Sequence, residues 1–381
     1  MTAGSRTSQI FIIYAIFFLQ AFAGGGIFAR IPDIQTGIGL SDGALGVALT
    51  FLSVGGLISL LVSGRLVQLF GTRPTMILCL PALAVTHLAA AQSGGMLTLC
   101  LSFVVAGIAF SISNVAINVE ADRIETAIGQ PIMNRCHGMW SLGMLAAALI
   151  GVAARAIPVP VAWHFAGILA LVLPVSFALW RMFHAAPPRG TGKLRKTIAM
   201  PDRVTMVLLL FGLSATVAQV GVQNWSVIYM ADRFDAPAWI DTLTLPAFLF
   251  TMALGRLYAD QWIVRIGARP FAQGMAVLSL MGGLFTVFAP SLWFVLAGFA
   301  LTGFGTAALF PMMISAAARV THRPSEDSVA SVILLLGVVI LGVPAAMGWI
   351  AELTSLRVAF AATLPLFLVT FALSKRMQLA D

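Results

Sequence analysis

The sequence predicts an all-α polytopic membrane protein, and three observations support this prediction. The 381 residues are 60% hydrophobic and only 9% charged, and the mean hydropathy is +0.98, values that no water-soluble globular domain approaches. Apolar stretches of about 17 to 25 residues, long enough to cross the hydrocarbon core of a bilayer as helices, recur from one end of the chain to the other. The basic residues also segregate to one side of these stretches.

Twelve apolar stretches of this length follow one another along the chain. The first begins after a short polar tail, MTAGSRTSQ, and lacks a small-residue cleavage site followed by a soluble chain. We therefore expect it to be retained as a span and not removed as a signal peptide. The expected spans are 9–29, 43–63, 75–93, 97–118, 136–154, 161–180, 204–230, 242–258, 271–289, 292–318, 328–350 and 358–374.

The basic residues predict the orientation of the spans. With the N-terminus in the cytoplasm, eighteen of the 22 Lys and Arg residues fall on the cytoplasmic side, and Arg30, Arg155, Arg233 and Arg357 fall outside. This positive-inside bias predicts a multi-pass protein of the inner (plasma) membrane with both termini in the cytoplasm. The net charge of +8 is thus a topology signal, and we expect membrane lipids, not nucleic acid, as partners.

The sequence divides into two halves. A charged, loop-like segment separates six spans from six, which predicts an N-terminal six-helix bundle over 1–180, a cytoplasmic linker over 181–203 and a C-terminal six-helix bundle over 204–381. Each half carries a related signature after its second span, FGTRP at 70–74 and IGARP at 266–270, and Gly-Arg-Leu precedes both. This internal echo indicates duplication and two pseudo-symmetric bundles.

Six spans plus six, a basic central loop and the Gly-x-Arg turns resemble the major facilitator superfamily (MFS), and the resemblance covers nearly the whole chain. The family loop has the form Gly-x-x-x-Asp-Arg-x-Gly-x-Arg. Gly64, Gly71 and Arg73 match it, whereas Gln68 and Leu69 stand where the acid and the first Arg are expected. The second copy is longer and retains an acid.

In the resembling family these loops latch the two halves on the cytoplasmic side. Glycine permits a tight turn, and the cations can meet helix ends. Simple positive-inside anchoring is the competing interpretation of the same residues. The gating candidates in the two loops are Gly64, Gly71, Arg73, Arg256, Asp260 and Arg269.

A narrower resemblance lies in FARIPDIQTGIGLSDGALGVAL at 28–49 and ETAIGQPIMNRCHGMWSLG at 125–143. These segments look like a branch of bacterial permeases that includes rhizopine (inosamine) uptake proteins and is distantly similar to fucose:proton symporters. The branch includes uptake proteins but says little about the substrate.

Polar side chains recur at helical spacing in several spans, which predicts one polar face on each. The MFS resemblance implies that spans 1, 4, 7 and 10 line the central cavity. Pairing of these amides and hydroxyls across helices is the competing interpretation. The stripe of span 4 comprises Ser111, Asn114, Asn118, Asp122 and Glu125. The stripe of span 7 comprises Thr216, Gln219, Gln223 and Ser226, with Asn224 and Trp225 beside it. The stripe of span 5 comprises Asn134, His137, Ser141 and Met144, with Trp140 beside it.

Span 1 contributes Gln20 beside a run of three glycines at 24–26, which allows close approach of a neighbouring helix or local unwinding. Tryptophans in these spans can stack on a sugar face or an amine, or can anchor at the membrane interface. The candidate substrate-binding residues are Gln20, Asn114, Asn118, Trp140, Ser141, Gln219, Gln223, Asn224 and Trp225.

Proton-driven transporters usually place a carboxylate inside the membrane, and the predicted spans hold no Asp or Glu at mid-depth. The resembling permeases tend to carry acids at the positions of Asn114, Gln219 and Asn224. We therefore expect a transporter that binds its solute through amides and is either uncoupled from protons or coupled through Glu125 and His137. The charges at Arg30 and Asp33, and those after span 7, are expected to be solvated loop charges or gate pairs.

These observations predict a permease, either secondary active, such as a symporter, or facilitative, that moves a polyol, sugar or amino sugar by alternating access. An efflux transporter of the same fold and a transporter-like receptor or sensor are the alternatives. We expect no enzyme, because HExxH and a buried Asp pair are absent from the sequence. The three cysteines lack metal-ligand spacing, so we expect no metal or cofactor, and we expect a monomer.

Overall fold

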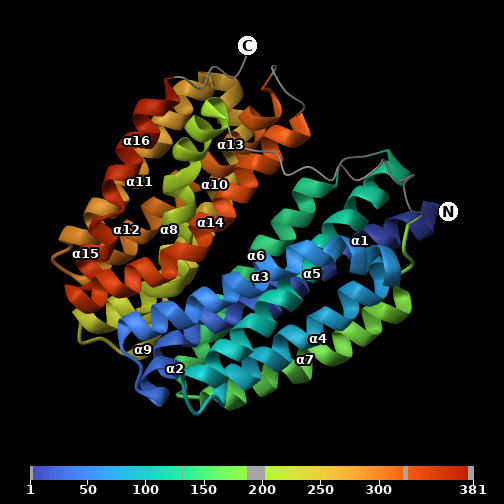
Figure 1. The fold of residues 1–381 in the computed structure, drawn as a ribbon, viewed down its shortest axis with the longest axis horizontal. Coiled ribbons are helices and arrows are strands. Elements are labelled where there is room, and N and C mark those ends of the chain that lie inside the picture. Colours follow the sequence, from blue (N-terminus) through green and yellow to red (C-terminus); the bar gives the residue numbers. More distant parts are fainter. Residues whose placement is uncertain (1–2, 130–131, 187–201, 321–324, 376–381) are drawn as a thin grey trace. The chain divides into compact units, whose positions relative to one another are not determined.

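The computed structural model describes residues 3–129, 132–186, 202–320 and 325–375, and in these ranges the chain is built from helices alone (Figure 1). Twelve helical segments of the described chain are long and apolar enough to cross a membrane. The predicted all-α class and the predicted number of spans are therefore confirmed.

Two compact units make up the chain. The first comprises Met1–Leu40 and Ala48–Leu194, and the second comprises Ser41–Val47 and Arg195–Asp381. The grouping of Ser41–Val47 with the second unit has no signal in the sequence. The predicted linker over 181–203 falls largely on 187–201, outside the described residues, so the linker stays a prediction.

Unit 1 holds the helices that form the first six spans. They are α1 (Ala3–Gly25), the 3₁₀ turn η1 (Gly26–Arg30), α2 (Ile31–Ile38), α3 (Asp42–Phe70, whose first residues group with unit 2), α4 (Thr72–Ala91), α5 (Met96–Ile128), α6 (Met133–Ala156) and α7 (Val161–Met182). Within the unit, α1 packs along α6, and α4 packs against α5 and α7. At 33 residues, α5 is about 50 Å long, so it extends well beyond a hydrocarbon core of about 30 Å.

The glycine run of the first span behaves as predicted. The α-helix ends at Gly25, and the chain continues as 3₁₀ turn from Gly26. A Cβ atom on Gly25 would lie 2.7 Å from the Met144 sulfur of α6. The run therefore gives both local unwinding and close helix approach.

Unit 2 holds α8 (Arg203–Arg233), α9 (Ala238–Thr242), α10 (Thr244–Ile266), α11 (Ala268–Phe288), α12 (Leu292–Thr306), α13 (Leu309–Ala318), α14 (Ser325–Leu353), α15 (Leu356–Ala361) and α16 (Leu364–Ser374). The predicted spans 292–318 and 358–374 are each interrupted, between α12 and α13 and between α15 and α16. The prediction of two continuous spans is therefore wrong at these points, where Pro311 and Pro365 follow the breaks by two or three residues.

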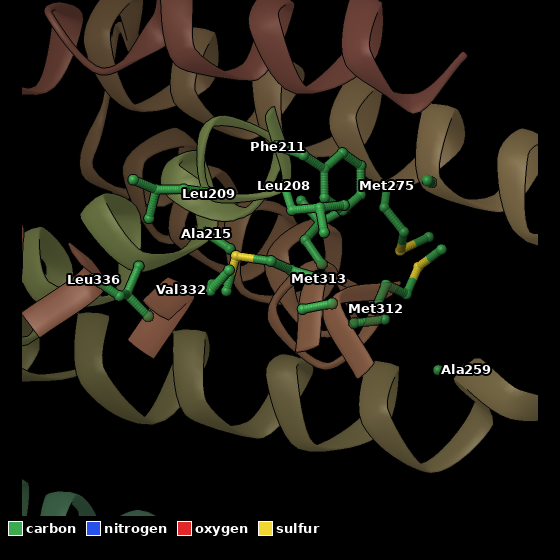
Figure 2. Packing of buried hydrophobic residues seen from close by; sticks show 14 of the residues in the cluster. Leu208, Leu209, Phe211, Ala215, Ala259, Met275, Met312, Met313, Val332 and Leu336 are labelled. Atoms are coloured by element: carbon green, nitrogen blue, oxygen red, sulfur yellow. The ribbon is translucent and has the colours of Figure 1, made fainter. Parts of the chain in front are cut away.

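An apolar cluster fixes the first half of α8 in unit 2. Phe211 is completely buried, and Met313 of α13 and Val332 of α14 are buried beside it. Figure 2 shows these side chains converging from α8, α13 and α14. Because apolar packing buries this half of α8, the polar side chains that could reach a solute lie after Ala215.

Candidate functional site

The second half of α8 carries two glutamines that the protein itself leaves free. Gln219 and Gln223 are both half-buried, and neither amide has a hydrogen-bond partner among the described residues. They lie four residues apart, so they share one face of the helix. An unpaired amide inside a bilayer costs several kcal/mol, so these groups need water or a solute as their partner.

The other polar residues of this stripe are used within unit 2. Ser226 Oγ and Thr244 Oγ1 of α10 are 2.8 Å apart and share a hydrogen bond. Thr216 Oγ1 donates to the Gly212 carbonyl, at 3.4 Å. Asn224 Nδ2 donates to the Val220 carbonyl at 2.8 Å and leaves its Oδ1 unused in the described chain. Pairing across helices therefore accounts for the hydroxyl at Ser226 but not for the glutamines.

Trp225 corrects the predicted site. It follows Gln223 by two residues, about 200° around the helix, and its side chain is 0% exposed. Its ring lies against Gly348 of α14, where an added Cβ would be 3.0 Å from the indole. Trp225 is therefore a packing residue on another face of α8, neither an interfacial anchor nor part of the glutamine face, although its indole N–H is buried without a partner in the described chain.

Unit 1 presents a comparable amide pair on α5. Asn118 Nδ2 donates to the Asn114 carbonyl at 2.8 Å and to Asn114 Oδ1 at 3.2 Å. Both residues are half-buried. Asn114 Nδ2 and Asn118 Oδ1 make no hydrogen bond within the described chain, so the pair keeps one donor and one acceptor available.

Gln20 is completely buried, and it joins α1 to α5. Its Nε2 donates to Ser113 Oγ at 2.8 Å and to the Phe110 carbonyl at 3.3 Å. Its Oε1 is buried without a partner in the described chain. Pairing across helices thus explains the amide donor of Gln20 but leaves its acceptor unaccounted for.

The predicted polar face of α6 is only partly assembled. Ser141 Oγ donates to the His137 carbonyl of its own helix at 3.0 Å. The His137 side chain is exposed, and its ring meets Phe17 of α1 edge-on, with centroids 5.7 Å apart. Trp140 has a buried indole N–H without a partner in the described chain, and the side chain of Asn134 lies outside the described residues.

Glu125 has a structural partner that its predicted coupling role did not include. Its Oε2 accepts hydrogen bonds from the backbone N–H groups of Ile132 at 2.7 Å and Met133 at 3.0 Å. These N–H groups open α6, where a carboxylate is favoured by unpaired donors and by the helix dipole. Glu125 therefore holds the start of α6, the helix that carries His137 and Trp140.

The two glycine turns of the predicted gating loops have the same backbone. Gly71 precedes α4 with φ +81°, and Gly267 precedes α11 with φ +86°. Such angles favour glycine over any residue with a Cβ. Gly64 lies inside α3 with open space around its α-carbon, so the tight turn belongs to Gly71 and not to Gly64.

Arg73 and Arg256, two of the predicted gating arginines, each form a hydrogen bond within their own unit. Arg73 donates to the Trp180 carbonyl at the end of α7, at 2.5 Å, and its guanidinium lies 5.5 Å from the Trp180 ring. Arg256 Nε donates to the Ala307 carbonyl between α12 and α13, at 3.2 Å. Arg269 is exposed, and the side chain of Asp260 lies outside the described residues.

Glu120 is a buried acid two residues beyond the predicted end of its span. It is 0% exposed, because α5 continues beyond the predicted span as far as Ile128. Its carboxylate accepts hydrogen bonds from Thr72 Oγ1 and from the Ala186 backbone N–H, both at 2.5 Å. The signal that could have found it is the apolar spacing of Ala116, Ile117, Ala121 and Ile124, which surrounds Glu120 and continues past residue 118 without a helix breaker.

The charges at the other ends of the spans are a further correction. Arg30 is only 4% exposed and pairs with Asp33, so the solvated-charge alternative is wrong there, and the gate-pair alternative stays a prediction. In unit 2, by contrast, Asp232 and Asp235 are exposed around an open hollow of about 390 Å³. Within the described residues, no three His, Cys, Asp or Glu side chains are placed to hold a metal ion.

Comparisons with known proteins agree with this architecture. The model of the Major Facilitator Superfamily matches residues 11–250 and 238–377. The chain is 28% identical over 355 residues to an uncharacterised transporter, y4wD, of Sinorhizobium fredii, covering 91% of this chain and 92% of the relative. It is also 28% identical over 315 residues to the membrane protein MosC of Rhizobium meliloti, covering 79% and 74% of the two chains.

Two solved structures share the fold. The nucleoside transporter NupG superposes with a TM-score of 0.73 at 13% identity, covering 98% of this chain and 100% of that one. A bacterial homologue of the human lysosomal transporter Spinster gives a TM-score of 0.74 at 14% identity, covering 99% and 98%.

Proposed function

The chain belongs to the Major Facilitator Superfamily and is a membrane transporter of that type; we propose that it moves a small, neutral polar solute across the inner membrane by alternating access. The proposed solute class is a polyol, sugar or amino sugar. The polar groups proposed to bind it are the amides of α5 and α8, which present both donors and acceptors without a formal charge.

The observation that carries this proposal is the pair of glutamine amides on α8. Gln219 and Gln223 have no hydrogen-bond partner in the described chain and are accessible, unlike Trp225 on the opposite side of the same helix. Packing and helix pairing therefore do not explain why the sequence keeps them. A hydroxylated solute supplies both an acceptor for each amide N–H and a donor for each amide oxygen.

The same residues argue for weak or absent proton coupling through the binding site. An amide offers the hydrogen-bonding shape of a carboxylate but does not titrate. Of the two groups proposed for coupling, Glu125 already accepts two backbone hydrogen bonds as its α6 cap. We propose that transport is either facilitative or coupled through His137 and Glu125 together.

Ligand-induced thermal stabilisation of the purified protein tests the binding proposal. The probes are myo-inositol, an amino-inositol, D-glucose, L-fucose and a cationic dye, because a ligand that binds the folded state raises its apparent stability. We expect one of the hydroxylated probes to raise the melting temperature. Removing one neutral hydrogen bond with Gln219→Ala or Asn114→Ala weakens that binding by about 1 kcal/mol, or roughly fivefold.

Gln261→Ala is the matched control, because Gln261 is an exposed amide on α10. It leaves the affinity unchanged if α5 and α8 hold the solute. Normal binding by both Gln219→Ala and Asn114→Ala would show that the amide faces are not the site.

Flux into proteoliposomes separates a transporter from a receptor and tests coupling. We expect the wild-type protein to take up the stabilising probe. In the double variant Glu125→Gln/His137→Gln, an imposed pH gradient should stimulate this uptake little. Binding without flux would favour the receptor alternative, and flux of the cationic dye alone would favour efflux. Strong stimulation that survives both substitutions would refute the coupling proposal.

A further inference from the structure

The break between α12 and α13 leaves one backbone carbonyl without its helical partner. In a continuous helix the Ala307 carbonyl would accept from the N–H of residue 311, but this residue is Pro311, which has no N–H. No other backbone N–H donates to the Ala307 carbonyl in the described chain. Because Ala307 is 0% exposed, and a buried carbonyl without a partner is destabilising, the break needs a donor from another helix.

Arg256 of α10 supplies this donor. Its Nε donates to the Ala307 carbonyl at 3.2 Å. The preceding residue lets the two helices approach, since a Cβ atom on Gly255 would lie 2.7 Å from the Ala307 Cβ. Unit 2 uses an arginine in the same way at the end of α11, where Arg233 donates to three backbone carbonyls. A side chain of α10 thus replaces the donor that the interrupted span lacks.

The break also separates two groups of helices within unit 2. Helix α12 packs mainly against α10 and α11, whereas α13 packs against α8 and α14. Thr251 Oγ1 of α10 donates to the Ala300 carbonyl of α12 at 2.7 Å. A Cβ atom on Gly212 of α8 would overlap the sulfur of Met313 on α13, and Figure 2 shows Met313 among the buried side chains of α8. Each half of the span is therefore fixed to its own neighbours, and the break joins the two groups.

A side-chain donor allows movement that a backbone donor does not. A bond from the N–H of residue i to the carbonyl of residue i−4 fixes the direction of the helix, whereas an arginine reaches its acceptor through several rotatable bonds. Helix α13 can therefore tilt against α12 while the buried Ala307 carbonyl stays paired with Arg256. Because α13 is packed on α8, such a tilt moves the helix that carries Gln219 and Gln223.

We propose that the break between α12 and α13 is a hinge of the transport cycle, and that Arg256 is its positioning residue. Arg256 keeps the Ala307 carbonyl paired while α13 and α8 tilt against α10 and α12. The role in transport rests on the proposed function, whereas the replacement of the missing N–H by Arg256 is tested without it. Positive-inside anchoring is the competing role of Arg256, and it requires the charge of the side chain and not its Nε donor.

Thermal unfolding of the detergent-purified protein separates the donor from the charge. Arg256→Met removes both and should lower the melting temperature by about 2–4 °C, because a buried carbonyl loses a charged donor. Arg256→Gln places an uncharged N–H at the same position along the side chain as the arginine Nε, so it should recover most of this loss. Equal losses in the two variants would show that only the charge matters and would overturn the assignment.

A second substitution returns the missing backbone donor. Pro311→Ala restores an N–H for the Ala307 carbonyl, so in this background Arg256→Met should lower the melting temperature by less than about 1 °C. Pro365→Ala is the matched control, because Pro365 deprives the Ala361 carbonyl of its donor at the break between α15 and α16, and no side chain donates to that carbonyl in the described chain. There Arg256→Met should keep its full effect. The same loss in both backgrounds would contradict the proposal.

The rate of uptake into proteoliposomes tests whether the hinge moves during transport. In Pro311→Ala protein one helix hydrogen bond must break in each cycle, which should lower the maximal rate for the stabilising probe about fivefold. Its dissociation constant, measured by thermal stabilisation, should stay the same. Pro365→Ala should keep the wild-type rate. A Pro311→Ala protein that transports at the wild-type rate would show that the break is static.

Hydrogen exchange decides the hinge even if none of the probes is transported, a result that would contradict the proposed function alone. The amides of Leu309, Phe310 and Met312, at the start of α13, should exchange faster than those in the middle of α12. Pro311→Ala should slow their exchange about fivefold, the equivalent of one hydrogen bond, whereas Pro365→Ala should leave it unchanged. Equal exchange at these amides in the wild type and in Pro311→Ala protein would overturn the hinge.

Discussion

Glu120 provides the sharpest test of how unit 1 is held together. Its buried carboxylate accepts from Thr72 Oγ1 at the start of α4 and from the Ala186 N–H just after α7, and Arg123 Nη1 lies 3.7 Å from it. One side chain of α5 thereby fixes the start of α4 and the segment after α7, at Ala186 within the expected linker. We expect Glu120→Ala to destabilise the protein far more than Glu120→Gln.

The magnitude follows from the groups that lose a partner. With alanine, the Thr72 hydroxyl and the Ala186 N–H are buried without an acceptor, at about 1–3 kcal/mol each, and Arg123 loses its ion pair. The sum is about 3–5 kcal/mol. Glutamine keeps one acceptor for the Ala186 N–H and can donate to the Thr72 hydroxyl, so its cost is about 1–2 kcal/mol.

Tryptophan fluorescence during heating measures the difference. A typical unfolding entropy of about 2.1 cal/mol/K per residue gives about 0.8 kcal/mol/K for a chain of this length. Glu120→Ala should therefore lower the melting temperature by about 4–6 °C, and Glu120→Gln by about 1–3 °C. Thr126→Ala, an exposed hydroxyl of the same helix, should stay within about 1 °C of wild type. Equal melting temperatures for the alanine and glutamine variants would refute the reasoning.

Three further predictions concern backbone and helix ends. Gly71→Ala should cost about 1–2 kcal/mol because of the positive φ at that position, whereas Gly138→Ala, in a helix with open space, should be neutral or stabilising in the same melting assay. Glu125→Gln should cost about 1 kcal/mol and raise hydrogen exchange at the first amides of α6, since a charged cap becomes a neutral one; unchanged exchange there would argue against the cap. Arg233→Met should cost about 2–4 kcal/mol in unfolding free energy, because several carbonyls lose their donor, and a loss below about 0.5 kcal/mol would show that water replaces the guanidinium.

Much of the fold is predictable because apolar length and charge bias are local properties of the sequence. The twelve spans follow from these properties, and the unwinding at Gly26 follows from the glycine run. The breaks between α12 and α13 and between α15 and α16 were missed, although Pro311 and Pro365 lie just after them and each lacks the N–H that would bond the carbonyl four residues earlier.

The candidate site is predictable where chemistry and spacing agree. Gln219 and Gln223 share a face because they are four residues apart, and the structure leaves their amides available. Trp225 was misassigned although the same helical geometry places it on the far side. The burial of Arg30 had no sequence signal, because a charge beside a proline-containing helix start is typical of a solvated loop and its burial depends on α6 and α7.

The Gly-Arg-Leu segments that precede the two glycine turns differ in their rotation about the helix axis. Seven residues separate Gly64 from Gly71, whereas twelve separate Gly255 from Gly267. The five additional residues lengthen the second copy by about 7.5 Å and rotate its Gly-Arg-Leu segment by about 140° relative to the turn. Arg65 accordingly faces outward, whereas Arg256 reaches the Ala307 carbonyl. The two duplicated loops thus differ in structure: Arg65 of the first is exposed without a hydrogen bond among the described residues, whereas Arg256 of the second binds at the break between α12 and α13. A substitution that destabilises one loop need not destabilise the other.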